Sequence, residues 1–161
     1  MNKILITGNA GSGKSTLASK LADQHQLPAF GLDSIVWQPN WKKTPEEEKR
    51  ARIEELVKQQ KWVIEGVSKQ AFLAADTIYF LDIPLSRCLL NILKRFISNG
   101  FKTRIGLPPN CPEYIGVFKA IRVAFLYQRK TRPMLMSLEN SLPSKNIFWI
   151  KSYSDLKREF S

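Results

Sequence analysis

Residues 8–16 read GNAGSGKST, a set of residue types and spacings suited to binding a phosphate chain. In this G-x-x-x-x-G-K-S pattern, glycines keep side chains away from the anion, so backbone N–H groups at a helix N-terminus can surround it. The Lys14 ammonium would reach the β- and γ-phosphate oxygens, the Ser15 hydroxyl would hold Mg²⁺, and Thr16 would donate to the α-phosphate. The predicted ATP-binding residues are Gly8, Asn9, Ala10, Gly11, Ser12, Gly13, Lys14, Ser15 and Thr16.

Such a loop needs a strand before it and a helix after it, and the sequence supplies both. Residues 3–7 (KILIT) form a short apolar run typical of a buried strand. Residues 15–25 place four apolar side chains at helical spacing behind the loop. Strand, glycine loop and helix together predict a phosphate-binding P-loop.

Beyond this unit, β-rich runs alternate with helical patterns along the chain. The predicted strands are residues 3–7, 28–32, 61–65, 77–82 and 146–151, and the predicted helices include residues 15–25, 85–97, 114–138 and 154–160. We expect a break near Arg132 and Pro133, and a further helix capped by Thr44 with Pro45 at its first position. Five strands alternating with helices predict a three-layer α/β fold around a five-stranded parallel sheet.

Residues 99–112 interrupt this alternation, because they contain two glycines and three prolines and show no periodicity. Long ordered loops are usually functional, so we predict a lid segment there. No repeat or low-complexity tract marks a boundary, and we expect residues 1–161 to form a single domain.

The composition excludes several classes of protein. Hydrophobic residues make up 43% and charged residues 24% of the chain, as in ordinary globular proteins. Cys88 and Cys111 are far apart without a CxxC pair, and His25 is the one histidine, so neither a disulfide framework nor a zinc site is indicated. No run approaches the roughly 18 apolar residues of a membrane helix, so we expect a cytoplasmic protein without a membrane partner.

The net charge of +11 lies almost entirely in the second half of the chain. Residues 1–86 carry 11 Lys and Arg against 10 Asp and Glu, whereas residues 87–161 carry 14 against 4. Such a basic segment indicates an anionic partner, such as ATP phosphates, a phosphorylated substrate or nucleic acid. A solvated basic face is the alternative interpretation.

Several short motifs, spread in order over nearly the whole chain, resemble those of known proteins. They are GNAGSGKST, LDSIVW (32–37), WVIEG (62–66), ADTIYFLDIP (75–84), LKR (93–95), KTR (102–104), CPE (111–113) and RKTRP (129–133). The loop and the order of elements resemble the small P-loop kinases of the adenylate kinase and shikimate kinase group. Together the motifs most closely resemble the DNA topology modulation proteins, which are P-loop proteins related to adenylate kinase. The resemblance implies a nucleoside-monophosphate-kinase-like P-loop NTPase fold with a basic lid.

The resemblance also implies roles for individual residues. Asp33 matches an acidic position that faces the acceptor or the magnesium waters, so it is the predicted base and, with Ser15, the predicted metal residue. Arg95 matches a lid arginine on the transferring phosphoryl group, with Arg104 and Arg132 as companions. With Lys14, these residues form the predicted catalytic set. A turn-forming role for Asp33 and a surface role for each arginine are the alternatives.

The chain departs from the resembled pattern at two places. Val67, Ser68 and Lys69 follow the expected acid and glycine, Glu65 and Gly66, in place of the usual polar and aromatic residues. Asn91 stands where the family commonly has an arginine that packs on adenine. Adenine recognition would then fall partly to Arg87 or to the backbone near residues 152–154. Asp82, at a strand end, matches a position that is more often structural.

Three tryptophans, Trp37, Trp41 and Trp62, could line an acceptor pocket, although aromatic residues near strand ends are more often core.

The sequence predicts two main functions. The first is an ATP- and Mg²⁺-dependent phosphotransferase acting on a small acceptor, for which a nucleotide is one candidate. The second is an ATP-binding, nucleic-acid-associated protein, although the sequence carries no helix-turn-helix, RRM or zinc-finger signature. A third hypothesis is a non-catalytic interaction module that depends on nucleotide binding. The acceptor and the oligomeric state stay open.

Overall fold

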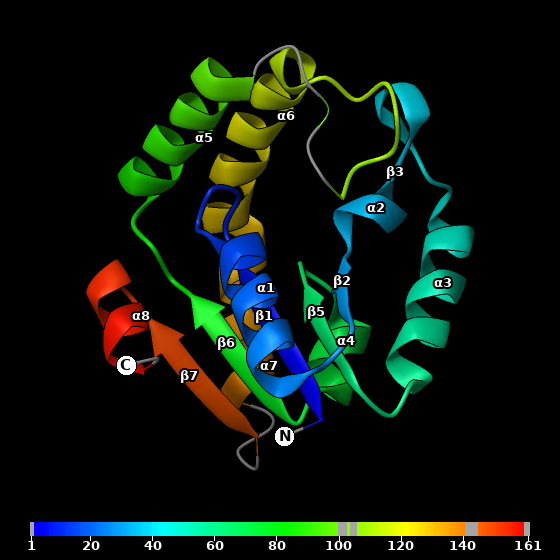
Figure 1. The fold of residues 1–161 in the computed structure, drawn as a ribbon, viewed down its shortest axis with the longest axis vertical. Helices are drawn as coiled ribbons and strands as arrows, with labels where there is room; N and C mark the ends of the chain where they lie inside the picture. The colour runs from blue at the N-terminus through cyan, green and yellow to red at the C-terminus, as the bar shows by residue number, and fades with distance from the viewer. Residues whose placement is uncertain (1, 100–102, 104–105, 141–144, 160–161) are drawn as a thin grey trace.

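The computed structural model of the chain describes residues 2–99, 103, 106–140 and 145–159. Its central sheet has five parallel strands in the order β2-β5-β1-β6-β7. The strands are β1 (Lys3–Gly8), β2 (Ala29–Gly31), β5 (Trp62–Glu65), β6 (Thr77–Leu81) and β7 (Asn146–Ile150). The predicted five-stranded parallel sheet is thus confirmed, with the strand before the glycine loop at its centre (Figure 1).

Helices cover both faces of this sheet. They are α1 (Lys14–His25), α2 (Asp33–Val36), the 3-10 turn η1 (Pro39–Trp41), α3 (Glu46–Lys58), α4 (Lys69–Ala74), α5 (Leu85–Asn99), α6 (Glu113–Leu126), the π-helical turn η2 (Tyr127–Thr131), α7 (Arg132–Asn140) and α8 (Tyr153–Glu159). Two short antiparallel strands, β3 (Trp37–Gln38) and β4 (Lys42–Lys43), form a separate hairpin. Among the described residues, no helix is long and apolar enough to cross a membrane.

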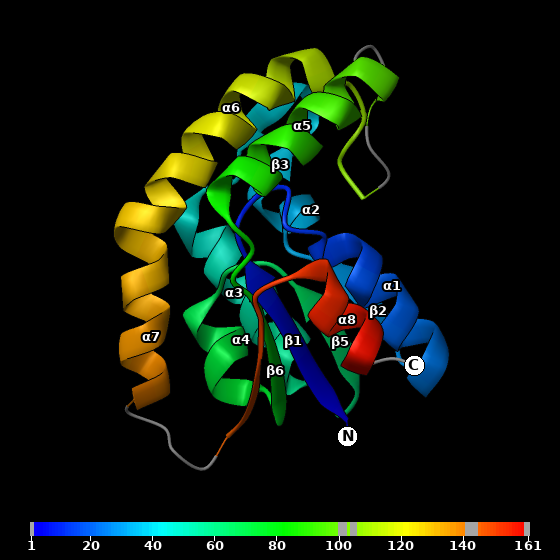
Figure 2. The ribbon, with the colours of Figure 1, turned by 90° about the vertical axis from the view of Figure 1, so that its left-hand side faces the viewer.

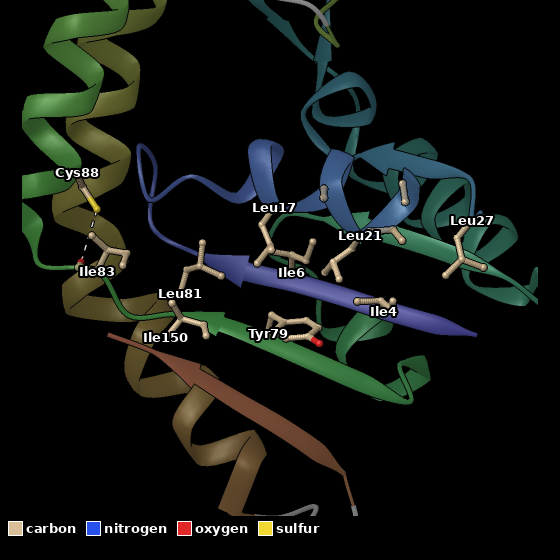
Figure 3. Packing of buried hydrophobic residues seen from close by; sticks show 13 residues of the cluster. Ile4, Ile6, Leu17, Leu21, Leu27, Tyr79, Leu81, Ile83, Cys88 and Ile150 are labelled. Carbon is tan, nitrogen blue, oxygen red and sulfur yellow. Dashed lines mark hydrogen bonds between the residues drawn. The ribbon is translucent and has the colours of Figure 1, made fainter. Parts of the chain in front are cut away.

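Alternating side chains of the central strand supply both layers of the core, as the two-residue period of a strand requires. Ile4 and Ile6 point to one face, where Leu17 and Leu21 of α1 cover them (Figure 3). Leu5 points to the opposite face and belongs to the cluster that α3, α4 and α7 cover. The sheet is therefore buried on both faces, which explains why its strands are apolar runs without a polar side.

Helices α5 and α6 form an arm that rises beyond the end of β1 and lies across the loop that follows it (Figure 2). Ile92 of α5 packs there with Val117 and Ala124 of α6. The chain between these helices spans most of the predicted lid. Its described part bends back, since Thr103 bridges to Pro112 and the Thr103 hydroxyl accepts from the Cys111 amide at 3.2 Å.

The prediction for the start of the third helix was wrong. Helix α3 begins at Glu46 with Pro45 as its N-cap, so Thr44 lies before the cap, Pro45 is not the first helical residue, and no side chain caps the helix. The irregularity expected near Arg132 and Pro133 lies directly before Arg132, in the π-helical turn. In a regular α-helix Pro133 would clash with the carbonyl four residues earlier, and the wider π-helical turn precedes this position.

Candidate active site

The loop between β1 and α1 has the backbone conformation that its glycines were predicted to allow. Gly8, Gly11 and Gly13 have φ angles of 151°, 75° and 94°, which side chains of L-residues rarely permit. At Gly11 a Cβ atom would lie 2.4 Å from the carbonyl oxygen of Cys88 in α5. The loop therefore packs directly against α5, and a side chain at this position would force it out of place.

Asn9 holds the loop from behind. Its side chain is buried; Nδ2 donates to the Ala124 carbonyl of α6 at 3.1 Å, and Oδ1 accepts from the Ala10 amide at 2.7 Å. The Asn9 carbonyl accepts from the Ser12 amide at 3.2 Å and from Lys14 Nζ at 2.5 Å. Asn9 and Ser12 are thus buried behind the loop, and the residues around them face the open side.

The open side of the loop has the chemistry of an anion site. Helix α1 begins at Lys14, and its N-cap is Gly13, which has no side chain to occupy the first-turn amides. An α-helix leaves the N–H groups of its first turn without intrahelical partners and carries a partial positive charge there. Lys14 adds a full positive charge at the same end. These features fit a phosphate chain.

A pocket of about 920 Å³ begins at this loop and continues between the α2 region and the α5–α6 arm. From the loop and α1, the pocket is lined by Gly8, Ala10, Gly11, Gly13, Lys14, Ser15, Thr16, Leu17 and Lys20. Of the other predicted site residues, Asp33 and Arg95 line the same pocket. The structure thus brings most of the predicted ATP-binding and catalytic residues to one continuous space.

Two acids lie near the loop at the ends of adjacent strands. Asp33 is the first residue of α2, two residues after β2 ends. Glu65 ends β5, and its Oε2 accepts a hydrogen bond from the Ser15 hydroxyl at 2.8 Å. Glu65 was not among the predicted site residues. Its position at a strand end beside the glycine loop is the sequence signal that could have placed it there.

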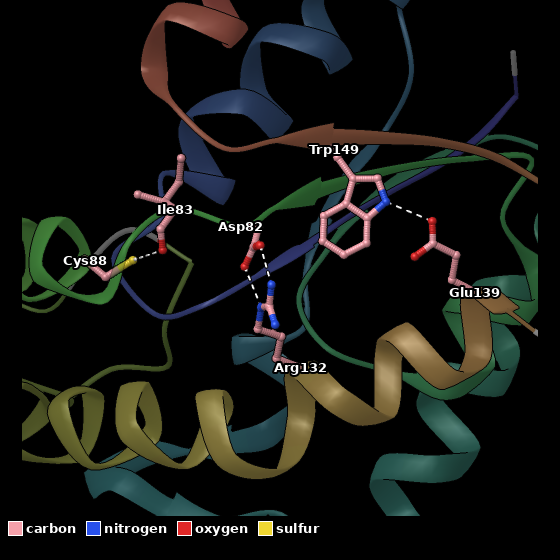
Figure 4. Close-up of polar contacts among 6 residues, drawn as sticks. All are labelled: Asp82, Ile83, Cys88, Arg132, Glu139 and Trp149. Carbon is pink, nitrogen blue, oxygen red and sulfur yellow. Dashed lines mark hydrogen bonds and ion pairs between the residues drawn. The ribbon is translucent and has the colours of Figure 1, made fainter.

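The three predicted arginines differ in their surroundings. Arg95 lines the pocket and pairs with Glu113, the first residue of α6, whose side chain is 2% exposed. Arg132 instead forms a two-pronged pair with Asp82, at 2.8 and 2.7 Å (Figure 4). This hydrogen bonding to Asp82 raises the pKa of Arg132. Asp82 therefore ties the end of β6 to the start of α7. Arg104 lies outside the described residues.

Replacement of Arg95 by alanine is expected to lower the free energy of unfolding by about 3 kcal/mol, because it leaves the buried Glu113 carboxylate without its cation. Urea denaturation measures the loss. The double variant Arg95→Ala/Glu113→Ala should recover most of it, since no charge is then left unpaired. A single variant as stable as the original protein would contradict the expectation. If Arg95 also acts on the phosphoryl group, the double variant should fold but still transfer the phosphoryl group slowly.

Asn91 of α5 and Tyr153 of α8 contact the backbone of the loop. Asn91 Nδ2 donates to the Gly11 carbonyl at 2.8 Å and to the Tyr153 hydroxyl oxygen at 2.6 Å. The Tyr153 hydroxyl donates to the Ser12 carbonyl at 3.4 Å. Burial raises the pKa of Tyr153, and the hydrogen bond from Asn91 partly opposes that rise. Asn91, which stands where the resembled family commonly has an arginine, thus contacts the loop backbone itself. Sequence reasoning missed Tyr153.

The tryptophans separate into two groups. Trp62 is fully buried in the sheet and belongs to the core. Trp37 and Trp41 line the pocket, with ring centroids 5.2 Å apart and planes at 80°. Lys119 of α6 places its ammonium 4.5 Å from the centroid of the Trp37 ring. Two of the three tryptophans thus line the pocket, and the third belongs to the core.

Comparison with solved structures agrees with this fold. The chain resembles a shikimate kinase from Acinetobacter baumannii in complex with shikimate, with a TM-score of 0.53 and 14% identity, over 94% of this chain and 84% of that one. A shikimate kinase from Bacteroides thetaiotaomicron matches with a TM-score of 0.49 and 18% identity, over 78% and 79%. No protein-family model and no curated protein matches. The first structure shows that the chain has the P-loop fold of shikimate kinase. The resemblance to DNA topology modulation proteins remains a hypothesis.

Proposed function

We propose that the protein is an ATP- and Mg²⁺-dependent phosphotransferase that acts on a small acceptor. The observation that carries the proposal is the continuous pocket from the glycine loop, past Lys14 and Ser15, to Asp33. Phosphoryl transfer requires an enzyme mainly to position two reactants and to neutralise charge. The loop offers the site for the triphosphate, and Asp33 lies in the same space where an acceptor would meet it.

In the proposed reaction the acceptor hydroxyl oxygen attacks the γ-phosphorus, and its proton passes to the Asp33 carboxylate. The bond between the γ-phosphorus and the β,γ-bridging oxygen breaks, so that ADP leaves with the electron pair. Lys14 neutralises the β- and γ-phosphate oxygens. Arg95 lies on the pocket wall and is proposed to stabilise the transferring group. The same role for Arg104 and Arg132 remains a prediction. Arg132 would have to contact the transferring group while it is paired with the Asp82 carboxylate.

The residues beside the loop fit Mg²⁺, which prefers oxygen ligands. Ser15 and Asp33 are proposed to hold it, and the hydrogen bond between Ser15 and Glu65 brings a further carboxylate to the same place. Mg²⁺ held by these residues would supply positive charge to offset that of the phosphate oxygens. Glu65 orients the Ser15 hydroxyl at the start of α1.

A coupled ADP-release screen across nucleosides, nucleotides and metabolites tests the proposal, with the Lys14→Ala variant as the blank. We expect Mg²⁺-dependent ADP release with at least one acceptor, above the rate without acceptor, and none in the blank. Failure of the original protein to bind ATP·Mg²⁺ would refute the proposal. ATP binding without any acceptor, together with strong DNA binding at about 0.15 M salt, would favour the nucleic-acid-associated alternative.

A further inference from the structure

We infer that the acceptor is an uncharged alcohol carried on a flat ring system, such as a nucleoside or an aromatic alcohol, and that it carries no phosphate. The inference rests on the proposed function, from which it takes Asp33 as the group that faces the acceptor hydroxyl. The wall of the pocket next to Asp33 and the charges around it support the inference.

The aromatic wall lies one helical turn from Asp33. Asp33 begins the four-residue helix α2, and Trp37 directly follows the end of that helix. Both residues line the pocket, as does Trp41, whose ring meets the Trp37 ring edge to face. An acceptor with its hydroxyl at Asp33 would therefore place its body against these two indole rings. Flat rings gain most from such a surface, because stacking and edge contacts add to the burial of apolar area.

Trp41 is held in position by contacts far away in the chain. Its indole Nε1 donates to the Pro112 carbonyl at 3.1 Å, and its backbone amide donates to Cys111 Sγ at 3.4 Å. Its ring occupies the space above Gly116, where a Cβ atom would lie 2.5 Å from it. Its φ of 56° is strained for a bulky residue, and such strain persists only where the surroundings fix it. A wall fixed in advance reduces the entropy lost when a ring binds.

Apolar side chains of neighbouring elements line the same pocket: Ala120, Val123 and Leu126 of α6, and Val67 after β5. Together with the two indole rings they form an apolar part of the pocket, here called the slot, which suits a planar group. A sugar phosphate without a base, or a polyhydroxylated carboxylate, would leave these surfaces without an apolar partner.

The charges beside the slot are balanced. Among the described residues that line the pocket beyond residues 8–16, the carboxylates are Asp33, Glu65 and Glu113, and the cations are Lys20, Arg95 and Lys119. Arg95 already pairs with Glu113. Lys119 donates to the Trp41 carbonyl at 3.3 Å and lies over both indole rings. A phosphate monoester would add close to two further negative charges to this balanced set.

The test uses matched pairs of alcohols and their phosphate esters: thymidine and its 5′-monophosphate, adenosine and AMP, and pyridoxine and its 5′-phosphate. Initial rates of ADP release at saturating ATP·Mg²⁺ give kcat/KM for each. We expect kcat/KM for at least one free alcohol to exceed that for its own ester by about tenfold or more, because binding of the ester would bury a charge that no opposite charge offsets. For that alcohol, Trp37→Ala should raise KM about tenfold, and Trp37→Phe should stay within about threefold of the original value, since a flat ring remains.

ATP affinity, measured for each variant by calorimetry, distinguishes loss of acceptor binding in the slot from misfolding of the protein. Preference for the ester in every pair would overturn the inference, as would an unchanged KM in Trp37→Ala. So would a protein that binds ATP·Mg²⁺, phosphorylates some other acceptor and ignores all the ring alcohols. Those outcomes leave the proposed function standing, whereas a protein that does not bind ATP·Mg²⁺ removes the proposed function itself.

Discussion

Replacement of Lys14 by alanine is expected to weaken ATP binding by about a hundredfold, close to 3 kcal/mol, and to abolish ADP release. Lys14 starts α1 and carries the full charge nearest to the proposed phosphate site. Its ammonium donates to the Asn9 carbonyl at 2.5 Å, so the loop itself holds this side chain. The loss would include charge-assisted hydrogen bonds to the β- and γ-phosphates. Calorimetric titration with ATP·Mg²⁺ measures it.

Lys58→Ala is the matched control, because it removes one lysine charge from the exposed surface of α3, where Lys58 pairs with Glu54. That variant should bind ATP as the original protein does, apart from a small salt-dependent change. Normal ATP affinity in Lys14→Ala would show that the loop does not use this lysine, and the assignment of the phosphate site would then fail.

The second large effect is expected from Asp33→Asn, which keeps the size of the side chain and removes its ability to accept a proton. We expect kcat to fall by about 100- to 10,000-fold, the range for loss of a positioned general base. The affinity for ATP·Mg²⁺ should fall far less than in Lys14→Ala, since the loop holds the phosphate chain and Asp33 would contribute only through the metal ion. Single-turnover measurement of phosphoryl transfer separates the chemical step from product release.

Asp23→Asn, on the exposed surface of α1, controls for the loss of one acidic charge outside the proposed site. An unchanged kcat in Asp33→Asn would contradict the assigned base. The same substitution at Glu65 would then identify the other carboxylate of the site, because Glu65 already contacts Ser15. A fall of kcat in both variants would indicate that both carboxylates contribute to the reaction.

Much of the fold could be predicted, because the signals for it are local. The glycine loop, the strand before it and the apolar face of α1 are adjacent in sequence, and physical chemistry restricts what such a segment can do. The centres of two predicted strands, residues 62–64 and 78–81, are buried on both faces and so appear as apolar runs. Short helix α4 was missed because six residues are too few for a helical pattern to stand out.

The finer parts of the candidate site could not be predicted, because they depend on residues that meet only after folding. Asn91 and Tyr153 are 62 positions apart, and Trp41 and Pro112 are 71 apart. Nothing in the neighbourhood of Glu113 shows that its carboxylate would be buried beneath Arg95. A basic residue in a basic segment is likewise no guide to whether it faces the pocket, as Arg95 does, or ties two elements together, as Arg132 does.

The glycine loop is held by three separate helices, through Ala124 of α6, Asn91 of α5 and Tyr153 of α8. Any shift of α6 around an acceptor would therefore pull on the same backbone that surrounds the triphosphate. Thermodynamic linkage makes this influence reciprocal: whatever the nucleotide does to the affinity for the acceptor, the acceptor does to the affinity for the nucleotide. For the proposed phosphotransferase, we therefore expect the two ligands to change each other's affinity through the way the loop is anchored.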